Sequence, residues 1–425
     1  TLLITSMLDI KAIRENPEDF KRRLARKGIE GSMIDELLGL DEKRRETIAA
    51  SETLKAEQNE ASKKIPQLEG EEKAQLLAQM KEISERKKIV ETERDEAEKN
   101  CQDILQSLPN TPHDEAPNGK DDTENKVIKT WGEKPNFSFP PKEHWELGEL
   151  LGILDLERGA KVSGARFYYL RNQLAILQQA LIFWAFTEVA KKGYSATIPP
   201  FMTRSEAIYG TGYLERNENY IVNPGEDDLY LIGTSEVPMM SYHAGDILEE
   251  KDLPLKFVAY SPCFRREAGS YGKDTKGILR VHQFEKVEMV MLALPEMNEA
   301  LHEEIRGIEE ELLQKLEIPY QVVDVCCGDL GNSASKKYDL EAWLPGQDQY
   351  REMTSTSICN DWQTRRLNIR VRRENGELVY AQALNGTAVS SRPLIAILEN
   401  FQQEDGSVLI PEILRPFCGF DKIAV

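Results

Sequence analysis

The sequence lacks the features that would place its protein in a membrane or in an oxidising compartment. No apolar run approaches the length of a membrane span, and no signal peptide is recognisable. The six cysteines show no zinc-ligand spacing, and the adjacent Cys326 and Cys327 would make a poor chelate, so we expect no zinc. These absences predict a cytoplasmic protein with reduced thiols and no membrane association.

Positive charge is also scarce, because 54 lysines and arginines are set against 73 aspartates and glutamates. The resulting formal net charge of −19 argues against indiscriminate binding of polyanions. A nucleic-acid partner would have to be bound by local basic patches and by shape. The length of 425 residues is sufficient for two or three domains and a large core.

Proline is nearly absent between residues 32 and 109, where Pro66 stands alone among Glu, Lys, Arg, Ala and Leu. Seam residues recur there in alternating steps of three and four, the spacing of a supercoiled helix pair. We predict an antiparallel helical hairpin that turns at residues 67–72, with arms of roughly 50 Å at 1.5 Å per residue. Its two seams are Leu37, Leu40, Arg44, Thr47, Ser51, Leu54, Gln58, Ala61, Ile65 and Leu68, and Leu76, Met80, Ile83, Lys87, Val90, Arg94, Ala97, Cys101, Ile104 and Leu108.

Polar residues weaken both seams, so we expect the hairpin to be a flexible arm. On composition alone, a dimerisation coiled coil is the commoner use of such a pattern. The weakening residues are Arg44, Gln58, Lys87 and Arg94.

The segment after the hairpin, up to residue 125, is rich in proline and acidic residues, as domain linkers are. We therefore divide the chain into an N-terminal domain, residues 1–110, and a second domain, residues 111–425. Residues 1–6 precede Met7, which looks like a natural start, and we treat them as an extension.

Residues 264–290 carry the side chains best suited to a nucleotide. Strand-like alternation ends in Phe264-Arg265-Arg266-Glu267 and resumes at 281–290, with a long glycine-rich basic loop between them. A guanidinium binds phosphate oxygens in a fork, a carboxylate accepts from an amine, and an aromatic face stacks a base. The alternative is an ordinary charged hairpin with solvated faces.

This stretch resembles motif 2 of the class II aminoacyl-tRNA synthetases, and its loop is similar to that of seryl-tRNA synthetases of the bacterial type. Residues 180–202, a helix leading toward Pro200, resemble motif 1, and residues 384–402 resemble motif 3. The resemblance extends over the chain from Met7. It implies an α+β fold, with an antiparallel catalytic sheet flanked by helices and an N-terminal antiparallel coiled-coil arm.

The family resemblance also implies a two-step reaction and a set of partners. Serine is activated with ATP to seryl-adenylate and is then transferred to the 3′ end of serine tRNA. The helical arm would bind the long variable arm of the tRNA, and motif 1 would form a homodimer interface. Whether selenocysteine tRNA is also charged stays open.

The resemblance assigns ATP to residues of motifs 2 and 3. In this pattern Arg265 contacts the α-phosphate, Glu267 accepts from the adenine amine, and Phe284 stacks on the ring. Arg392 holds the γ-phosphate side, and Arg265 and Arg392 are the expected catalytic residues. The expected ATP-binding set is Arg265, Arg266, Glu267, Arg280, Phe284, Glu352, Met353, Thr354, Ser355 and Arg392.

Residues 350–357 resemble the segment that supplies ligands to ATP and its metal in this family. We expect Mg²⁺ at Glu352 and Ser355, because a carboxylate and a hydroxyl provide the hard oxygen ligands that this ion prefers. No residue is expected to act as a general base.

The resemblance assigns serine to a loop and two strands. Glu288 is expected to bind the serine ammonium, and Thr234, Glu236 and Thr387 would frame its side chain. On the residues alone, residues 234–236 could equally cap a helix. Arg392 follows Thr387 by five positions where six is usual, which leaves the role of Thr387 open. The expected serine-binding set is Thr234, Ser235, Glu236, Glu288, Asn385 and Thr387.

Three other functions compete with this interpretation. A class II synthetase for another small amino acid, such as threonine or proline, would be expected to carry an anticodon domain after motif 3. An amino-acid:carrier-protein ligase of similar fold would lack the arm. A synthetase-like binding or regulatory protein would be expected to have lost motif residues that are intact here.

Overall fold

The computed structural model describes residues 8–213, 220–222, 226, 228–267 and 276–424. They form two compact units, and the boundary falls between Pro109 and Asn110, one residue before the predicted division. The expectations for residues 1–6 and for loop residues 268–275 lie outside the described residues.

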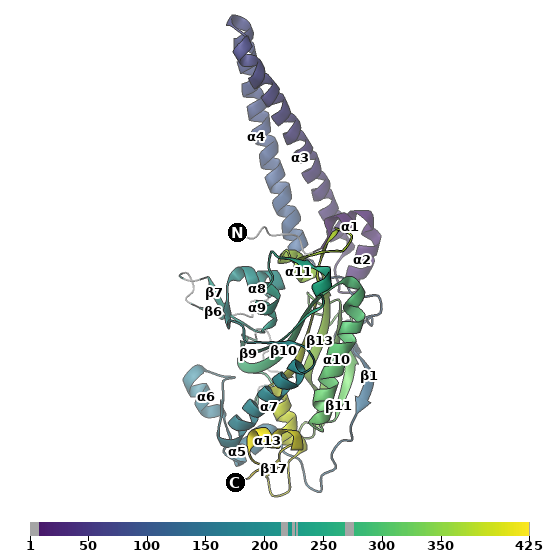
Figure 1. Ribbon diagram of the computed structural model, residues 1–425, viewed down its shortest axis with the longest axis vertical. Helices are drawn as coiled ribbons and strands as arrows, with labels where there is room; N and C mark the ends of the chain where they lie inside the picture. The colour runs from purple at the N-terminus through teal and green to yellow at the C-terminus, as the bar shows by residue number, and fades with distance from the viewer. Residues whose placement is uncertain (1–7, 214–219, 223–225, 227, 268–275, 425) are drawn as a thin grey trace. The chain divides into compact units, whose positions relative to one another are not determined.

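The N-terminal unit consists of two short helices followed by two long ones. The long helices, α3 and α4, lie side by side and run antiparallel (Figure 1), which confirms the predicted helical hairpin. Their 34 and 38 residues correspond to about 51 and 57 Å at 1.5 Å per residue. The bounds are α1 Ile10–Glu15, α2 Pro17–Ala25, α3 Gly31–Lys64, η1 Ile65–Gln67 and α4 Gly70–Ser107.

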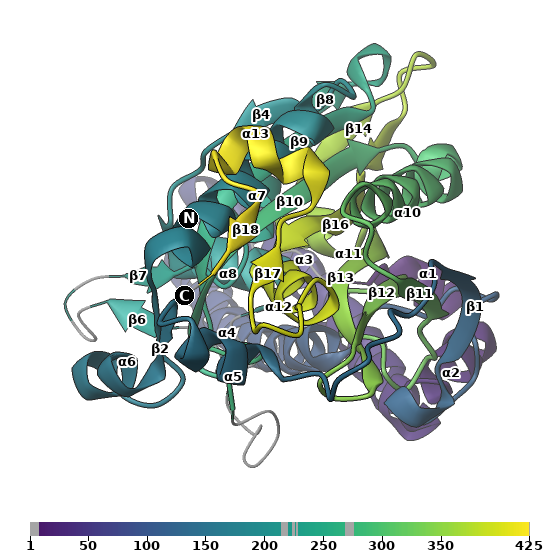
Figure 2. The ribbon, with the colours of Figure 1, turned by 90° about the horizontal axis from the view of Figure 1, so that it is seen from below.

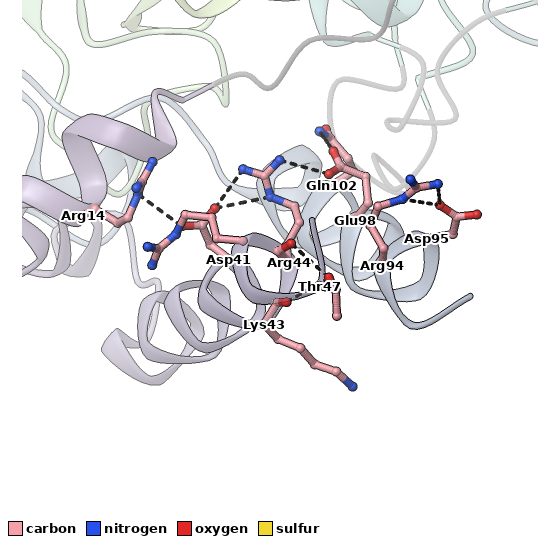
Figure 3. A network of polar contacts seen from close by, with 10 residues as sticks. Arg14, Asp41, Lys43, Arg44, Thr47, Arg94, Asp95, Glu98 and Gln102 are labelled. Atoms are coloured by element: carbon pink, nitrogen blue, oxygen red, sulfur yellow. Dashed lines mark hydrogen bonds and ion pairs between the residues drawn. The ribbon is translucent and has the colours of Figure 1, made fainter. Parts of the chain in front are cut away.

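Every predicted seam position of the hairpin is buried or half-buried, although many flanking side chains are exposed. Three buried residues of these helices were not in the predicted seams, namely Ile34 and the charged Asp41 on α3 and Leu105 on α4. The Asp41 carboxylate forms an ion pair with Arg14 at 3.1 Å and accepts a hydrogen bond from Arg44 at 3.0 Å (Figure 3). Arg44 also reaches Glu98 on α4 at 3.1 Å, so a residue predicted only to weaken the seam ties the two helices together.

The second unit is built on an eight-stranded sheet with the order β1-β11-β12-β13-β16-β10-β9-β4. Neighbouring strands pair antiparallel except β4 and β9, which are parallel, so the predicted antiparallel catalytic sheet is confirmed. The bounds are β1 Lys126–Trp131, β4 Ser195–Thr197, β9 Leu255–Phe264, β10 Gln283–Ala293, β11 Tyr320–Asp324, β12 Lys336–Leu344, β13 Gln349–Asn360 and β16 Gln382–Ser390.

Helices pack against this sheet, and its apolar residues are divided between one large core and a second, smaller buried cluster. Helices α7 (Asn172–Ala190), α10 (Asn298–Lys315) and α12 (Arg392–Asn400) contact its strands (Figure 2). The other helices are α5 His144–Leu150, α6 Leu156–Ser163, α8 Ser205–Thr211, α9 Glu236–Ser241, α11 Trp362–Arg366 and α13 Arg415–Cys418, with 3-10 turns η2 Asp122–Glu124, η4 Glu250–Asp252, η5 Pro295–Met297 and η6 Glu412–Leu414.

Four small sheets complete the unit and lie around the main one. In the described residues their strand orders are β2-β3, β5-β7-β6, β8-β14-β15 and β17-β18. Their strands are β2 Leu154–Asp155, β3 Tyr169–Leu170, β5 Met202–Thr203, β6 Tyr220–Val222, β7 Leu229–Leu231, β8 Ile247–Glu249, β14 Arg370–Arg372, β15 Leu378–Tyr380, β17 Val408–Leu409 and β18 Lys422–Ile423.

Helix α7 corrects one expectation from the sequence. By length and composition alone it could cross a membrane, so the statement that no apolar run approaches a span was wrong. Half of its apolar window is buried inside the protein, and core helices of soluble proteins pass the same test. Leu174, Leu181 and Trp184 pack into the main core, where the hydrophobic effect accounts for their apolar character.

The strands of motif 2 are shifted from their predicted bounds. Strand β9 ends at Phe264, three residues before the predicted end at Glu267. Glu267 has a φ of 48°, in the left-handed region, which is incompatible with extended strand backbone. The partner strand β10 begins at Gln283 and not at Val281.

Candidate active site

A cavity of about 350 Å³ lies at the main sheet and is lined by residues from many separate elements. Strands β10, β13 and β16 supply its base, and the first residue of α12 and the segments 278–281 and 329–337 supply further walls. The alternation of strand β10 directs Phe284, Lys286 and Glu288 to the same side, and all three line the cavity.

One end of the cavity gathers the motif 2 residues expected at a nucleotide. The guanidinium of Arg265 lies 5.1 Å from the ring centroid of Phe284, a cation–π arrangement. Its Nε also donates to the carbonyl of Gly233 at 3.2 Å, which fixes the direction of the fork. Arg280 pairs with Glu267 at 3.1 Å. The structure therefore brings arginine, carboxylate and aromatic side chains of motif 2 together at this cavity.

Arg392 and Glu352 form a second charged pair at the cavity wall. Arg392 Nη1 donates to both the backbone carbonyl and the Oε2 of Glu352, each at 2.9 Å. Burial alone would raise the pKa of Glu352, but the charges of Arg392 and Lys337 outweigh it and lower the pKa to about 2. Glu352 is therefore ionised at neutral pH, and Ser355 lines the same cavity.

A second group of polar residues surrounds two carboxylates, Glu236 and Glu288, which are 3% and 2% exposed. Glu288 Oε2 lies 2.7 Å from the ammonium of Lys286 and accepts from the hydroxyl of Thr387 at 3.0 Å. The predicted serine-binding residues Glu288 and Thr387 are therefore in direct contact.

Glu236 is held by three donors from separate parts of the chain. It accepts from Tyr213 at 2.7 Å, from Gln363 at 2.7 Å and from Asn385 at 3.2 Å. Burial, followed by the negative charge of Glu288, raises the pKa of Glu236 above its ordinary value. The two carboxylates thus occupy different electrostatic environments in one cavity.

Several predicted site residues do not line the cavity. Arg266 is exposed and is not among its lining residues. Thr234 is buried, and its hydroxyl accepts from the backbone N–H of Glu236 at 3.2 Å, while Ser235 Oγ donates to Ala259 O at 3.4 Å. Thr234 thus stabilises the local turn, but the side chain of Ser235, the residue before α9, makes no capping hydrogen bond.

Two predicted ATP-binding residues line the cavity but are also used elsewhere. Met353 is 2% exposed and belongs to the main core. The Thr354 hydroxyl donates to Glu309 of α10 at 3.3 Å.

The residues that the sequence interpretation missed include Lys286, Tyr213 and Lys337, which line the cavity, and Gln363, which donates to Glu236. Lys286 could have been found, because strand alternation places it on the same face as Phe284 and Glu288. Tyr213 and Gln363 carried no signal, because only the folded chain brings them to Glu236.

Comparisons with known proteins agree with this geometry. Residues 7–112 match the family described as seryl-tRNA synthetase N-terminal domain, and residues 218–401 match the tRNA synthetase class II core domain (G, H, P, S and T). The serine–tRNA ligase of Corynebacterium glutamicum is 46% identical over 415 residues, which cover 98% of each chain. This chain belongs to the seryl-tRNA synthetase family. The predicted family is thereby confirmed.

Solved structures of seryl-tRNA synthetases share the fold over the whole chain. The crystal structure of the enzyme from Pyrococcus horikoshii complexed with ATP is 44% identical, with a TM-score of 0.92 over 98% of this chain and 99% of that chain. The cytoplasmic enzyme of Naegleria fowleri in complex with AMP is 34% identical, with a TM-score of 0.87 and 98% of each chain covered. The predicted fold class is confirmed.

Proposed function

We propose that this chain is a serine–tRNA ligase, which activates serine with ATP to seryl-adenylate and transfers serine to the 3′ end of serine tRNA. The observation that carries the proposal is a single cavity that joins three arginines, an aromatic ring and a pair of buried carboxylates. The ATP and AMP complexes of the relatives support a nucleotide substrate, which we propose binds at the arginine end of the cavity.

Activation begins when the serine carboxylate attacks the α-phosphorus of ATP and pyrophosphate leaves. This step gathers negative charge on phosphate oxygens, so positioned cations and orientation are what it requires. Arg265, oriented by Gly233 and Phe284, would contact the α-phosphate. Arg392, paired with Glu352, would hold the γ-phosphate side. The terminal ribose hydroxyl of the tRNA then attacks the seryl-adenylate, and AMP leaves.

The cavity also offers oxygen ligands that fit Mg²⁺. Glu352 is ionised and Ser355 carries a hydroxyl, and both line the cavity. Mg²⁺ commonly takes one or two such protein ligands and completes its shell with phosphate oxygens and water. The ion would neutralise phosphate charge, while Arg392 orients the Glu352 carboxylate.

Serine would bind at the carboxylate end of the cavity. Glu288 would accept the serine ammonium beside Lys286, because a carboxylate has room for several donors. Glu236 and Thr387 would frame the hydroxymethyl group. A pocket built to hydrogen-bond a hydroxyl rejects alanine, since its own polar groups are then left unpaired. Threonine would be excluded by lack of room.

The helical arm would bind the long variable arm of serine tRNA, and of selenocysteine tRNA where that substrate is present. Exposed cations occur along both long helices and would meet tRNA phosphates despite the negative net charge. They include Lys55, Lys63, Lys64, Lys73, Lys81, Arg86 and Lys88.

We also propose a cytoplasmic homodimer without membrane association, formed through α7 and the motif 1 strand. Ile176 and Phe183 on α7 are 48% and 58% exposed, and Ile198 is 68% exposed. Exposed apolar side chains gathered in one region are typical of a protein interface. The buried state of all six cysteine thiols suits a reducing compartment.

The aminoacylation reaction tests this function. Purified protein is incubated with ATP, Mg²⁺, labelled serine and either serine tRNA or a tRNA without a long variable arm. We expect serine to be esterified to serine tRNA alone. Charging of serine tRNA with another amino acid, or no charging, would contradict the proposal.

A further inference from the structure

The start of helix α5 contacts residues 276–278, the part of motif 2 that leads into the wall of the cavity. His144 is fully buried, and its Nε2 accepts a hydrogen bond from the backbone N–H of Ile278 at 3.0 Å. The ammonium of Lys276 lies 4.7 Å from the ring centroid of the next residue, Trp145. Residues on both sides of Gly277 are therefore held by α5.

Gly277 allows this approach because it has no side chain. A Cβ at this position would lie 1.9 Å from His144 Nε2, and its φ of 70° is also one that glycine adopts most readily. The imidazole thus occupies the space next to the backbone of residue 277. This close packing fixes the position of the segment 276–278 more tightly than a surface contact would.

Glu399 on α12 holds His144 from the other side. Its Oε1 lies 3.0 Å from His144 Nδ1 and also accepts from the backbone N–H of His144 at 3.0 Å. Its Oε2 accepts from the backbone N–H of Gly346 at 3.0 Å. Since the N–H of Ile278 can only donate, Nε2 must be the acceptor, and the proton lies on Nδ1 toward Glu399.

These contacts connect two walls of the nucleotide site. Helix α12 begins at Arg392, which lines the cavity, and carries Glu399 two turns later. From Glu399 the connection runs through His144 to Ile278, which lines the cavity and is followed by Arg280. The buried pair of His144 and Glu399 therefore fixes the motif 3 helix α12 relative to residues 276–280 of motif 2.

We propose that His144 and Glu399 are positioning residues for ATP, which keep residues 276–280 against the nucleotide. The proposal rests on the proposed function, because it takes the arginine end of the cavity as the ATP site. Neither residue is among those lining the cavity. Loss of either side chain should therefore weaken ATP binding, because Ile278 and Arg280 would no longer be held in place. Serine binding at the other end of the cavity, built by Glu236 and Glu288, should be unaffected.

His144→Asn isolates the contact with the motif 2 segment. An asparagine amide can still donate to Glu399 from the Nδ1 position, so the buried carboxylate keeps a partner, but it does not reach Ile278. His144→Gln is the rescue variant, because its longer amide can accept from Ile278. His302→Asn is the matched control, since His302 is also buried and its Nε2 donates to the carbonyl of Thr356 at 3.1 Å.

The variants are compared by ATP–pyrophosphate exchange and by hydrogen exchange of a peptide containing Ile278. For His144→Asn we expect the KM for ATP to rise at least tenfold, the KM for serine to stay within twofold, and the Ile278 amide to exchange faster. His144→Gln should recover most of the ATP KM, and His302→Asn should leave the Ile278 amide protected.

An unchanged KM for ATP in folded His144→Asn, or an equal rise in both KM values, would overturn the proposal. If the wild type shows no serine-dependent exchange, the proposed function fails instead. Calorimetric ATP binding to the same variants then decides the inference: weaker binding to His144→Asn alone supports it, and equal binding to all variants overturns it.

Discussion

Replacing Arg265 with alanine should remove a cation from the point where charge develops during serine activation. The side chain is fixed before ATP arrives, because its Nε donates to Gly233 O at 3.2 Å and its guanidinium lies 5.1 Å from the centroid of Phe284. Loss of a comparable preorganised donor in other enzymes costs about 2.7–4 kcal/mol in the transition state. We therefore expect serine-dependent pyrophosphate exchange to fall by about 10²–10³.

The same change should have only a modest effect on stability. The lost hydrogen bond contributes about 0.5–1.5 kcal/mol, and the cation–π contact about 0.5–1 kcal/mol. Their sum is small beside the 5–15 kcal/mol that is typical of a native domain. The variant should therefore stay folded, and its melting temperature should fall by only a few degrees.

Two variants make the Arg265 experiment specific. Arg265→Lys keeps the charge but loses the planar fork, so activity should recover only in part. Arg266→Ala removes a guanidinium from the neighbouring exposed position. We expect this variant to lose at least tenfold less pyrophosphate-exchange activity than Arg265→Ala. Unchanged exchange in folded Arg265→Ala would show that this arginine does not contact the α-phosphate.

Three further predictions follow from the structure. Burial, followed by the charge of Glu288, raises the pKa of Glu309, so the stability linked to Glu309 is complete below pH about 4.5 and is lost as the pH rises through its folded pKa. Glu309→Gln should gain stability toward urea at pH 8 and little at pH 4.5, whereas an equal gain at both would contradict this reasoning. Replacing residues 40–104 by a short flexible linker should leave pyrophosphate exchange near normal and abolish tRNA charging, and full charging by this protein would exclude the arm as a tRNA reader. Light scattering should give a dimer mass at micromolar concentration, with or without the arm, and a monomer mass would refute the α7 interface.

The helical hairpin could be predicted because its physics is local. Steps of three and four residues place one face of each helix toward the other, and burial follows that pattern even where the residue is polar, as at Arg44. Asp41 was missed because its burial depends on three arginines, one of which comes from α1. A seam defined by apolar spacing gives no weight to such a charge cluster.

In the candidate site, too, the residues that could be predicted are those close together in the sequence. Strand alternation and the resemblance to known motifs located Arg265, Phe284 and Glu288, which lie within one short stretch of sequence. The partners of Glu236 come from α11, from β16 and from Tyr213 just after α8, and no sequence pattern joins them. His144 was likewise without a visible role, because its two partners lie 134 and 255 residues away along the chain.

ATP–pyrophosphate exchange with each of the twenty amino acids tests the proposed serine specificity most directly. The contacts around Glu236, Glu288 and Thr387 predict strong exchange with serine alone, weak exchange with threonine and still weaker exchange with alanine. A larger signal with threonine or proline than with serine would contradict the account of this cavity.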